Sequence, residues 1–126
     1  MTDSKLNDRN TRDLKQRTKR FALDVIQFVE SLPSGETSRV LGRQLLRSGT
    51  SVGANYRAAK RAKSTADFIS KMGTVEEEAD ESAYWLELLM DSGKVKPVQA
   101  QPLVREANEL LAIAVASINT AKRKVR

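Results

Sequence analysis

Neither cysteine nor histidine occurs among the 126 residues of the chain. The lack of cysteine excludes disulfides, thiolate nucleophiles and cysteine-ligated metal or iron–sulfur sites. The lack of histidine removes the most common general base and the most common transition-metal ligand. No apolar run approaches the roughly 20 residues that span a bilayer, and the polar first residues do not resemble a signal peptide. We therefore expect a cytoplasmic protein that has no membrane partner.

Proline, glycine and aromatic residues are scarce, whereas charged residues make up 30% of the chain. This composition favours long, solvent-facing helices, and the length favours a single domain over residues 1–126. Apolar residues recur at helical spacing in four segments, at about 11–32, 36–63, 64–92 and 97–123. Because the links between these segments are short, the sequence predicts an all-α fold, an antiparallel up-down-up-down four-helix bundle.

The expected helix ends follow from local sequence. Proline and glycine at residues 33–35 oppose continuation of the first helix. Ser64–Asp67 is an acidic variant of a capping box and predicts the start of the third helix. Gly93 is suited to the position just after that helix, and proline favours a start of the fourth helix between Pro97 and Pro102.

Two features of the second segment stand out. Gly49 and Gly53 lie inside it, and each lowers helix propensity by about 1 kcal/mol, so we expect either a kink near residues 48–53 or the close approach of another backbone. Asn55 lies on the apolar stripe, where a buried amide needs hydrogen-bond partners. We predict that it fixes register or pairing in the core; a direct functional contact is the alternative. The apolar stripe of the last segment is broad, which predicts that part of it faces another subunit.

Charge is strongly partitioned along the chain. Residues 39–63 carry seven basic residues and no acid, and residues 67–91 carry eight acids against Lys71 alone. These opposite charges can pair within one protomer or across a subunit interface. The acids crowd one helix and histidine is absent, which does not fit the dinuclear carboxylate sites of helical bundles. The chain also has no nucleophile elbow and no phosphate-binding P-loop. We predict no cofactor, no metal and no enzymatic activity.

In an antiparallel bundle, the start of the first helix and the ends of the second and fourth helices lie at the same end. Cations gather there, and Arg17 and Arg20 belong to the same stretch of the first helix. Cations at helix C-termini complement the helix dipole, but this does not explain the cations near the start of the first helix. We predict a phosphate-binding surface. The candidate nucleic-acid contacts, which we call the basic pole, are Arg12, Lys15, Lys19, Arg57, Lys60, Arg61, Lys63, Lys122, Arg123 and Lys124.

The run QLLRSGTSVGANY, from Gln44 to Tyr56, resembles the signature Q-L-x-R-x-x-x-S-[IV]-x-x-N. This signature is typical of the bacterial four-helix bundle family associated with intervening sequences of large ribosomal RNA genes. The matching positions are Gln44, Leu45, Arg47, Ser51, Val52 and Asn55. The stretch Glu77–Leu89 is similar to the second signature of the family, with Glu81 at its acidic position. Where the family often continues Asn-[IV]-Ala-Glu-Gly, this chain reads NYRAA and is more basic.

The resemblance covers about residues 14–122 and implies a ring-shaped homopentamer. Similar proteins include accessory proteins of diversity-generating retroelements, which partner a reverse transcriptase. We therefore predict a non-enzymatic homo-oligomer that binds RNA, or a ribonucleoprotein partner such as a reverse transcriptase, through the basic pole. The alternative is a structural or scaffold protein whose charges serve subunit assembly only.

Overall fold

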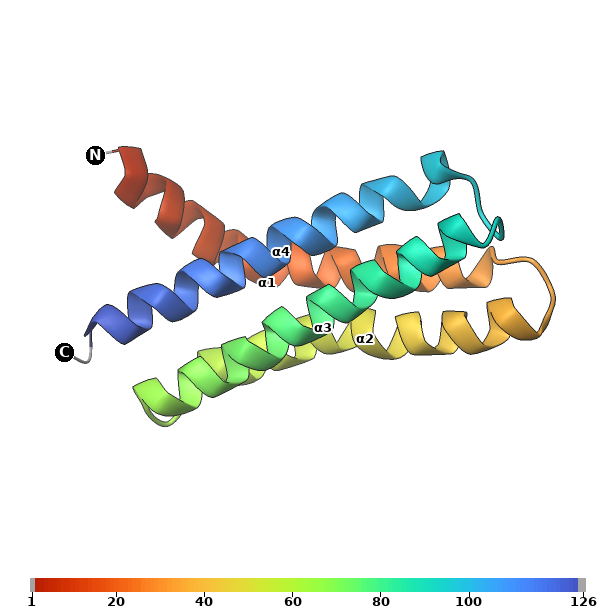
Figure 1. The fold of residues 1–126 in the computed structure, drawn as a ribbon. Helices are drawn as coiled ribbons and strands as arrows, with labels where there is room; N and C mark the ends of the chain where they lie inside the picture. Colours follow the sequence, from red (N-terminus) through yellow and green to blue (C-terminus); the bar gives the residue numbers. More distant parts are fainter. Residues whose placement is uncertain (1, 125–126) are drawn as a thin grey trace.

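The computed structural model describes residues 2–124, and the side chains of residues 14–124. It contains the helices α1 (Thr2–Glu30), α2 (Glu36–Lys60), α3 (Thr65–Asp91) and α4 (Pro97–Lys124). Each helix packs on the next one in sequence, and α4 returns to α1. Figure 1 shows neighbouring helices running in opposite directions. The predicted all-α antiparallel four-helix bundle is confirmed. In the described part of the chain, every helix is too short or too polar to cross a membrane.

Two helix ends differ from the sequence prediction by three residues or more. α1 begins at Thr2 rather than near residue 11, because residues 2–10 lack an apolar stripe but contain no proline or glycine that would stop a helix. α2 ends at Lys60 rather than residue 63. The backbone N–H groups of Arg61 and Ala62 each donate to a carbonyl three residues earlier at 3.1 Å, so the last turn tightens and closes the helix.

The start of α3 follows the predicted cap. The Ser64 hydroxyl oxygen accepts from the Asp67 N–H at 3.1 Å, and the Asp67 carboxylate accepts from the Lys63 N–H at 3.1 Å. Hydrogen bonds from the Lys71 ammonium and from the Lys63 backbone hold the pKa of Asp67 below its ordinary value. The charged carboxylate therefore stabilises this end of α3 above about pH 4, and its contribution is lost as the pH falls through the lowered pKa.

The end of α3 and the start of α4 also follow the sequence. Gly93 has a positive φ of 78°, which glycine adopts without strain. The N–H groups of Gly93 and Lys94 donate to the carbonyls of Met90 and Leu89, both at 3.0 Å, as in a Schellman motif. α4 begins at Pro97, the first of the two prolines considered.

The core lies along the axis of the bundle and takes residues from all four helices. Its fully buried large side chains include Phe21, Leu45, Met72, Leu86, Leu89 and Leu110. The second apolar line of α4, with Leu111 and Ile113, packs against this core at partial exposure. The breadth of the α4 stripe is therefore used within the protomer. The exposed large apolar side chains lie mainly on other helices: Leu23, Ile26, Val40, Leu46, Tyr84 and Val98.

The glycines of α2 allow α1 to approach closely. A Cβ atom on Gly49 would lie 2.9 Å from both methyl carbons of Val25. A Cβ on Gly53 would lie 3.2 Å from the Thr18 hydroxyl oxygen and 3.4 Å from the Thr18 carbonyl oxygen. α2 is one continuous helix through this region. Of the two expectations for these glycines, the close approach of a neighbouring helix is the one observed.

This contact predicts opposite effects for two glycine-to-alanine changes. We expect Gly49→Ala to lower the free energy of unfolding by about 1–2 kcal/mol, because Val25 is buried and β-branched and cannot move aside. Gly73→Ala is the matched control inside α3, since a Cβ there meets nothing within 4 Å. It should raise stability by up to about 1 kcal/mol through helix propensity. Urea denaturation measures both, and equal stabilisation by the two changes would contradict the close contact.

Candidate nucleic-acid interface

The basic pole lies at one end of the bundle. Figure 1 shows the ends of α2 and α4 at the end where α1 and α3 begin. Thr18 of α1 lies against Gly53 of α2, so Lys15 and Lys19 flank the last turns of α2. The side chain of Arg12 lies outside the described residues. The other members of the basic pole are all exposed: Lys15, Lys19, Arg57, Lys60, Arg61, Lys63, Lys122, Arg123 and Lys124.

These exposed cations have no carboxylate partner among the side chains of residues 14–124. No ion pair among the described side chains involves any of them. The surrounding sequence explains this, because residues 14–23, 49–66 and 110–124 contain no acid. Asp67 is close in sequence, but its carboxylate is held by Lys71 and by the Lys63 backbone. Among the described side chains, the positive charge of the basic pole is therefore not neutralised.

Arg17, whose charge the sequence assigned to the same end, belongs to a different contact. Its Nε lies 3.1 Å from Glu106 Oε2, and its Nη2 lies 2.7 Å from Glu106 Oε1 and 3.0 Å from Glu109 Oε1. The hydrogen bond that Arg17 donates to Glu106 is the main cause that raises the pKa of Arg17, against the effect of burial. Arg17 thus joins α1 to α4. Arg20 pairs with Asp24 one turn along α1.

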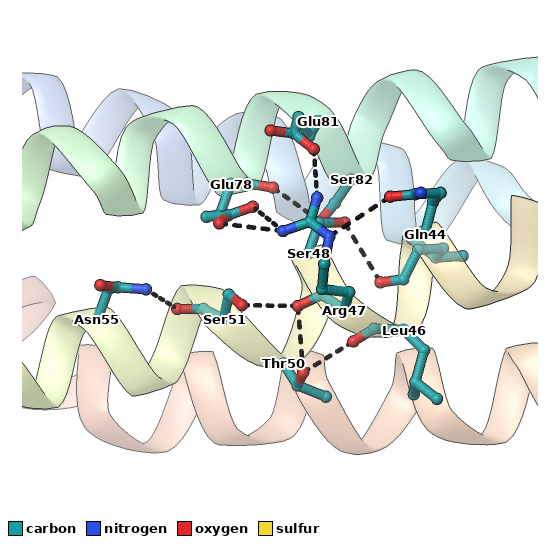
Figure 2. Close-up of polar contacts among 11 residues, drawn as sticks. Gln44, Leu46, Arg47, Ser48, Thr50, Ser51, Asn55, Glu78, Glu81 and Ser82 are labelled. Atoms are coloured by element: carbon teal, nitrogen blue, oxygen red, sulfur yellow. Dashed lines mark hydrogen bonds and ion pairs between the residues drawn. The ribbon is translucent and has the colours of Figure 1, made fainter.

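Arg47 is the centre of a second ion-pair cluster, between α2 and α3 (Figure 2). Its Nη1 lies 3.2 and 3.3 Å from the two carboxylate oxygens of Glu78, and its Nη2 lies 2.5 Å from Glu81 Oε1. Burial acts against the charge, but the two carboxylates raise the pKa of Arg47 overall. At this position the opposite charges of α2 and α3 pair within the protomer. Arg47 is therefore neutralised, unlike the basic pole.

The polar residues of the signature form one row on α2, which Figure 2 shows beside α3. Gln44 accepts from Arg47 Nε at 3.4 Å. The Ser51 hydroxyl donates to the Arg47 carbonyl at 2.7 Å, and Asn55 Nδ2 donates to the Ser51 carbonyl at 2.9 Å. These side chains bond to their own helix, except for Arg47, which reaches α3. Within the signature row, it is therefore Arg47 that joins α2 to α3.

Asn55 is only half-buried, so the prediction of a core amide is wrong. The core position between Val52 and Ala59 is taken by Tyr56, which is 3% exposed. Asn55 and Tyr56 follow Val52 by three and four residues, and both steps are helical spacings. Tyr56 takes the core position because its ring buries more apolar surface. The same burial raises the pKa of Tyr56. The Asn55 amide bonds to its own helix and does not fix the register between helices.

A pair of serines joins α2 and α3 in the core, directly below Arg47. The hydroxyl oxygens of Ser48 and Ser82 lie 2.9 Å apart, and both residues are fully buried. Ser82 also lies 2.8 Å from the Glu78 carbonyl oxygen, and Ser48 lies 3.3 Å from the Leu45 carbonyl oxygen. Each hydroxyl has one proton, so one serine donates to the other, which donates to its own helix. Sequence reasoning placed both serines on core stripes but did not pair them.

The described acidic residues do not gather as a metal site would require. No group of three or more of them in the described part of the chain is arranged to hold a metal ion. Glu78 and Glu81 pair with Arg47 instead. The exposed acids of α3 without a described ion pair are Glu77, Asp80, Glu87 and Asp91.

The serine pair predicts which polar substitution destabilises the bundle. We expect Ser82→Ala to lower the free energy of unfolding by about 1–3 kcal/mol, because it leaves the buried Ser48 hydroxyl only its longer contact. Asn55→Ala should lower it by about 0.5 kcal/mol or less, since a half-buried bond within one helix is lost. The double change Ser48→Ala with Ser82→Ala should be milder than the sum of the single changes. Urea denaturation of the four variants measures these differences. A larger loss for Asn55→Ala than for Ser82→Ala would return the register role to Asn55.

Comparison with known proteins finds a matching family model and matching solved structures. A model of the family described as "23S rRNA-intervening sequence protein" matches residues 11–116. A crystal structure of a protein of unknown function from the S23 ribosomal protein family of Bacteroides thetaiotaomicron VPI-5482 has 34% sequence identity and a TM-score of 0.78. The similarity covers 83% of this chain and 97% of that chain. Among curated proteins, none matches.

Proposed function

The chain belongs to the 23S rRNA-intervening sequence protein family, and from this membership we propose that it is a non-enzymatic, homo-oligomeric bundle that binds RNA in the cytoplasm through the basic pole. The observation that carries the proposal is the difference between two sets of cations. Arg17 and Arg47 are each held by two carboxylates. The exposed cations of the basic pole have no such partner among the described residues. A surface of unpaired cations attracts a polyanion.

Some of the cations at this end offset helix dipoles, so not all of them add to the attraction for a polyanion. The ends of α2 and α4 each carry a partial negative charge, which their own cations offset. Lys15 and Lys19 lie within α1, well before its end, and have no such role. The pole therefore keeps an excess of positive charge after the helix dipoles are considered, and this excess is available to phosphates.

We base the proposed homo-oligomer on surfaces of one copy that complement surfaces of the next copy. Leu23 and Ile26 of α1 are exposed and lie one turn apart, and the exposed side chain of Leu46 of α2 points toward α1 (Figure 2). On α3, exposed acids flank Tyr84, which is 53% exposed. An acidic surface on one copy and a basic surface on the next favour a head-to-tail contact, which closes into a ring. From the family resemblance, we propose that this ring is a pentamer and that its protein partner is a reverse transcriptase.

The RNA proposal is tested by removing cations from the pole. In the variant Arg57→Ala, Lys60→Ala, Arg61→Ala, affinity for unrelated RNA sequences should fall alike, because phosphate contacts carry no sequence information. The slope of log affinity against log salt should flatten by about three, since each lost phosphate contact releases one counterion fewer. Fluorescence anisotropy between about 50 and 200 mM salt measures both quantities.

The matched control removes the same number of charges elsewhere, in the variant Arg43→Ala, Lys94→Ala, Lys96→Ala. These exposed residues lie in α2 away from the pole and in the link between α3 and α4. The control should keep nearly all of the affinity. Equal losses in both variants would show attraction by net charge alone. No binding by the unaltered protein at physiological salt would favour a scaffold whose charges serve assembly only.

Assembly is tested by light scattering after size exclusion. The particle should have a mass several times the 14.0 kDa of one chain, and Leu23→Gln with Leu46→Gln should shift it toward the protomer. Val98→Gln is the control, because Val98 is 75% exposed and lies at the start of α4. A mass of one chain for the unaltered protein at micromolar concentration would contradict the homo-oligomer.

A further inference from the structure

We infer that the basic pole selects base-paired RNA over single strands. The inference rests on the proposed function, and it names the form of RNA that this surface fits. It follows from three features of the described residues: where the aromatic side chains lie, how the backbone at the end of α2 is held, and how the cations are divided between helices.

The aromatic side chains near the basic pole are used in the core. Tyr56 is 3% exposed and Phe21 is 1% exposed, and Phe68 packs partly buried against the same core. The exposed Tyr84 lies near the middle of α3, among acids, with its ring centroid 5.2 Å from that of Trp85. Proteins that bind single strands gain affinity from each base stacked on an aromatic ring. Among the described residues, the pole instead presents ammonium and guanidinium groups, which contact phosphates, and no exposed aromatic ring.

The backbone that carries these cations is fixed by hydrogen bonds. After the end of α2, the N–H groups of Arg61, Ala62 and Lys63 donate to Ala58, Ala59 and Asp67 respectively. Ala59 and Tyr56 anchor the last turn of α2 in the core. Because this backbone is fixed, the side chains of Arg57, Lys60 and Arg61 extend from set positions, which suits phosphates that are themselves held at fixed spacing. A duplex offers such phosphates, whereas a flexible strand must first be ordered, at a cost in entropy.

The cations of α2 and α4 form two separate rows. Among the described residues, no Cα atom of α2 lies within 8 Å of a Cα atom of α4, because the two helices lie diagonally across the bundle. Double-stranded RNA is recognised by phosphates on the two sides of its wide minor groove. One row, Arg57, Lys60 and Arg61, can contact one strand, and Lys122, Arg123 and Lys124 the other.

The test compares an RNA duplex of about 20 base pairs, longer than the about 16 that a double-stranded RNA-binding module spans, with each of its separated, unstructured strands. Fluorescence anisotropy of the unaltered protein at physiological salt should give about tenfold tighter binding to the duplex, or more. Equal affinity for the single strands would overturn the inference while leaving RNA binding intact. No binding to either form would remove the proposed function as well.

The two rows are then removed one at a time. One variant carries Arg57→Ala, Lys60→Ala and Arg61→Ala, and the other carries Lys122→Ala, Arg123→Ala and Lys124→Ala. Each variant should bind the duplex only about as tightly as the unaltered protein binds single strands. Single-strand affinity should change less, because one row is enough for one strand. Circular dichroism and light scattering check that each variant stays folded and assembled. Undiminished duplex selectivity after loss of either row would overturn the two-row arrangement.

Discussion

The position of α2 between its neighbours depends on side chains that are small or missing. On one side, Gly49 and Gly53 leave room for Val25 and Thr18 of α1. On the adjacent side, Ser48 meets Ser82 of α3 in the core. Small residues let two helices approach closely, but by themselves they do little to fix the register between the helices. The serine pair adds direction, because a buried hydroxyl is satisfied at one register only. The end of α2, and with it half of the basic pole, is placed by these two contacts.

The described charged side chains fall into two groups: those that pair with opposite charges on a neighbouring helix and those that do not. Arg17 and Arg47 lie where two helices meet, and acids of the opposite helix surround each of them. Such part-exposed pairs contribute little stability individually, but they determine which charges are left over. What remains is a cationic end and an acidic stretch of α3. The separation gives each protomer two different faces, which suits both contact between copies and contact with a polyanion.

Sequence reasoning recovered the helices because their evidence is local. Apolar spacing, the cap at Ser64 and the glycine at Gly93 each act within a few residues. The start of α1 was missed, since polar residues without a stripe give no periodicity. Asn55 was placed in the core because three-residue and four-residue steps from Val52 both fit a helix, and only packing selects Tyr56. The partners of Arg17 and Arg47 lie 89 and 31 residues or more away in sequence. No local pattern contains that information.

The interface between α1 and α4, which we call a seam, differs from the other three helix interfaces because these two helices are far apart in sequence. The other three seams join helices connected by short links, so each forms as a hairpin between neighbours in sequence. Arg17 and Glu106 are 89 residues apart, and their seam has the sparsest packing of the four. Contacts between distant residues carry the largest loop-closure entropy and tend to form late. The bundle is therefore expected to assemble as three successive hairpins, and the ion pairs of Arg17 to close it at the end of folding.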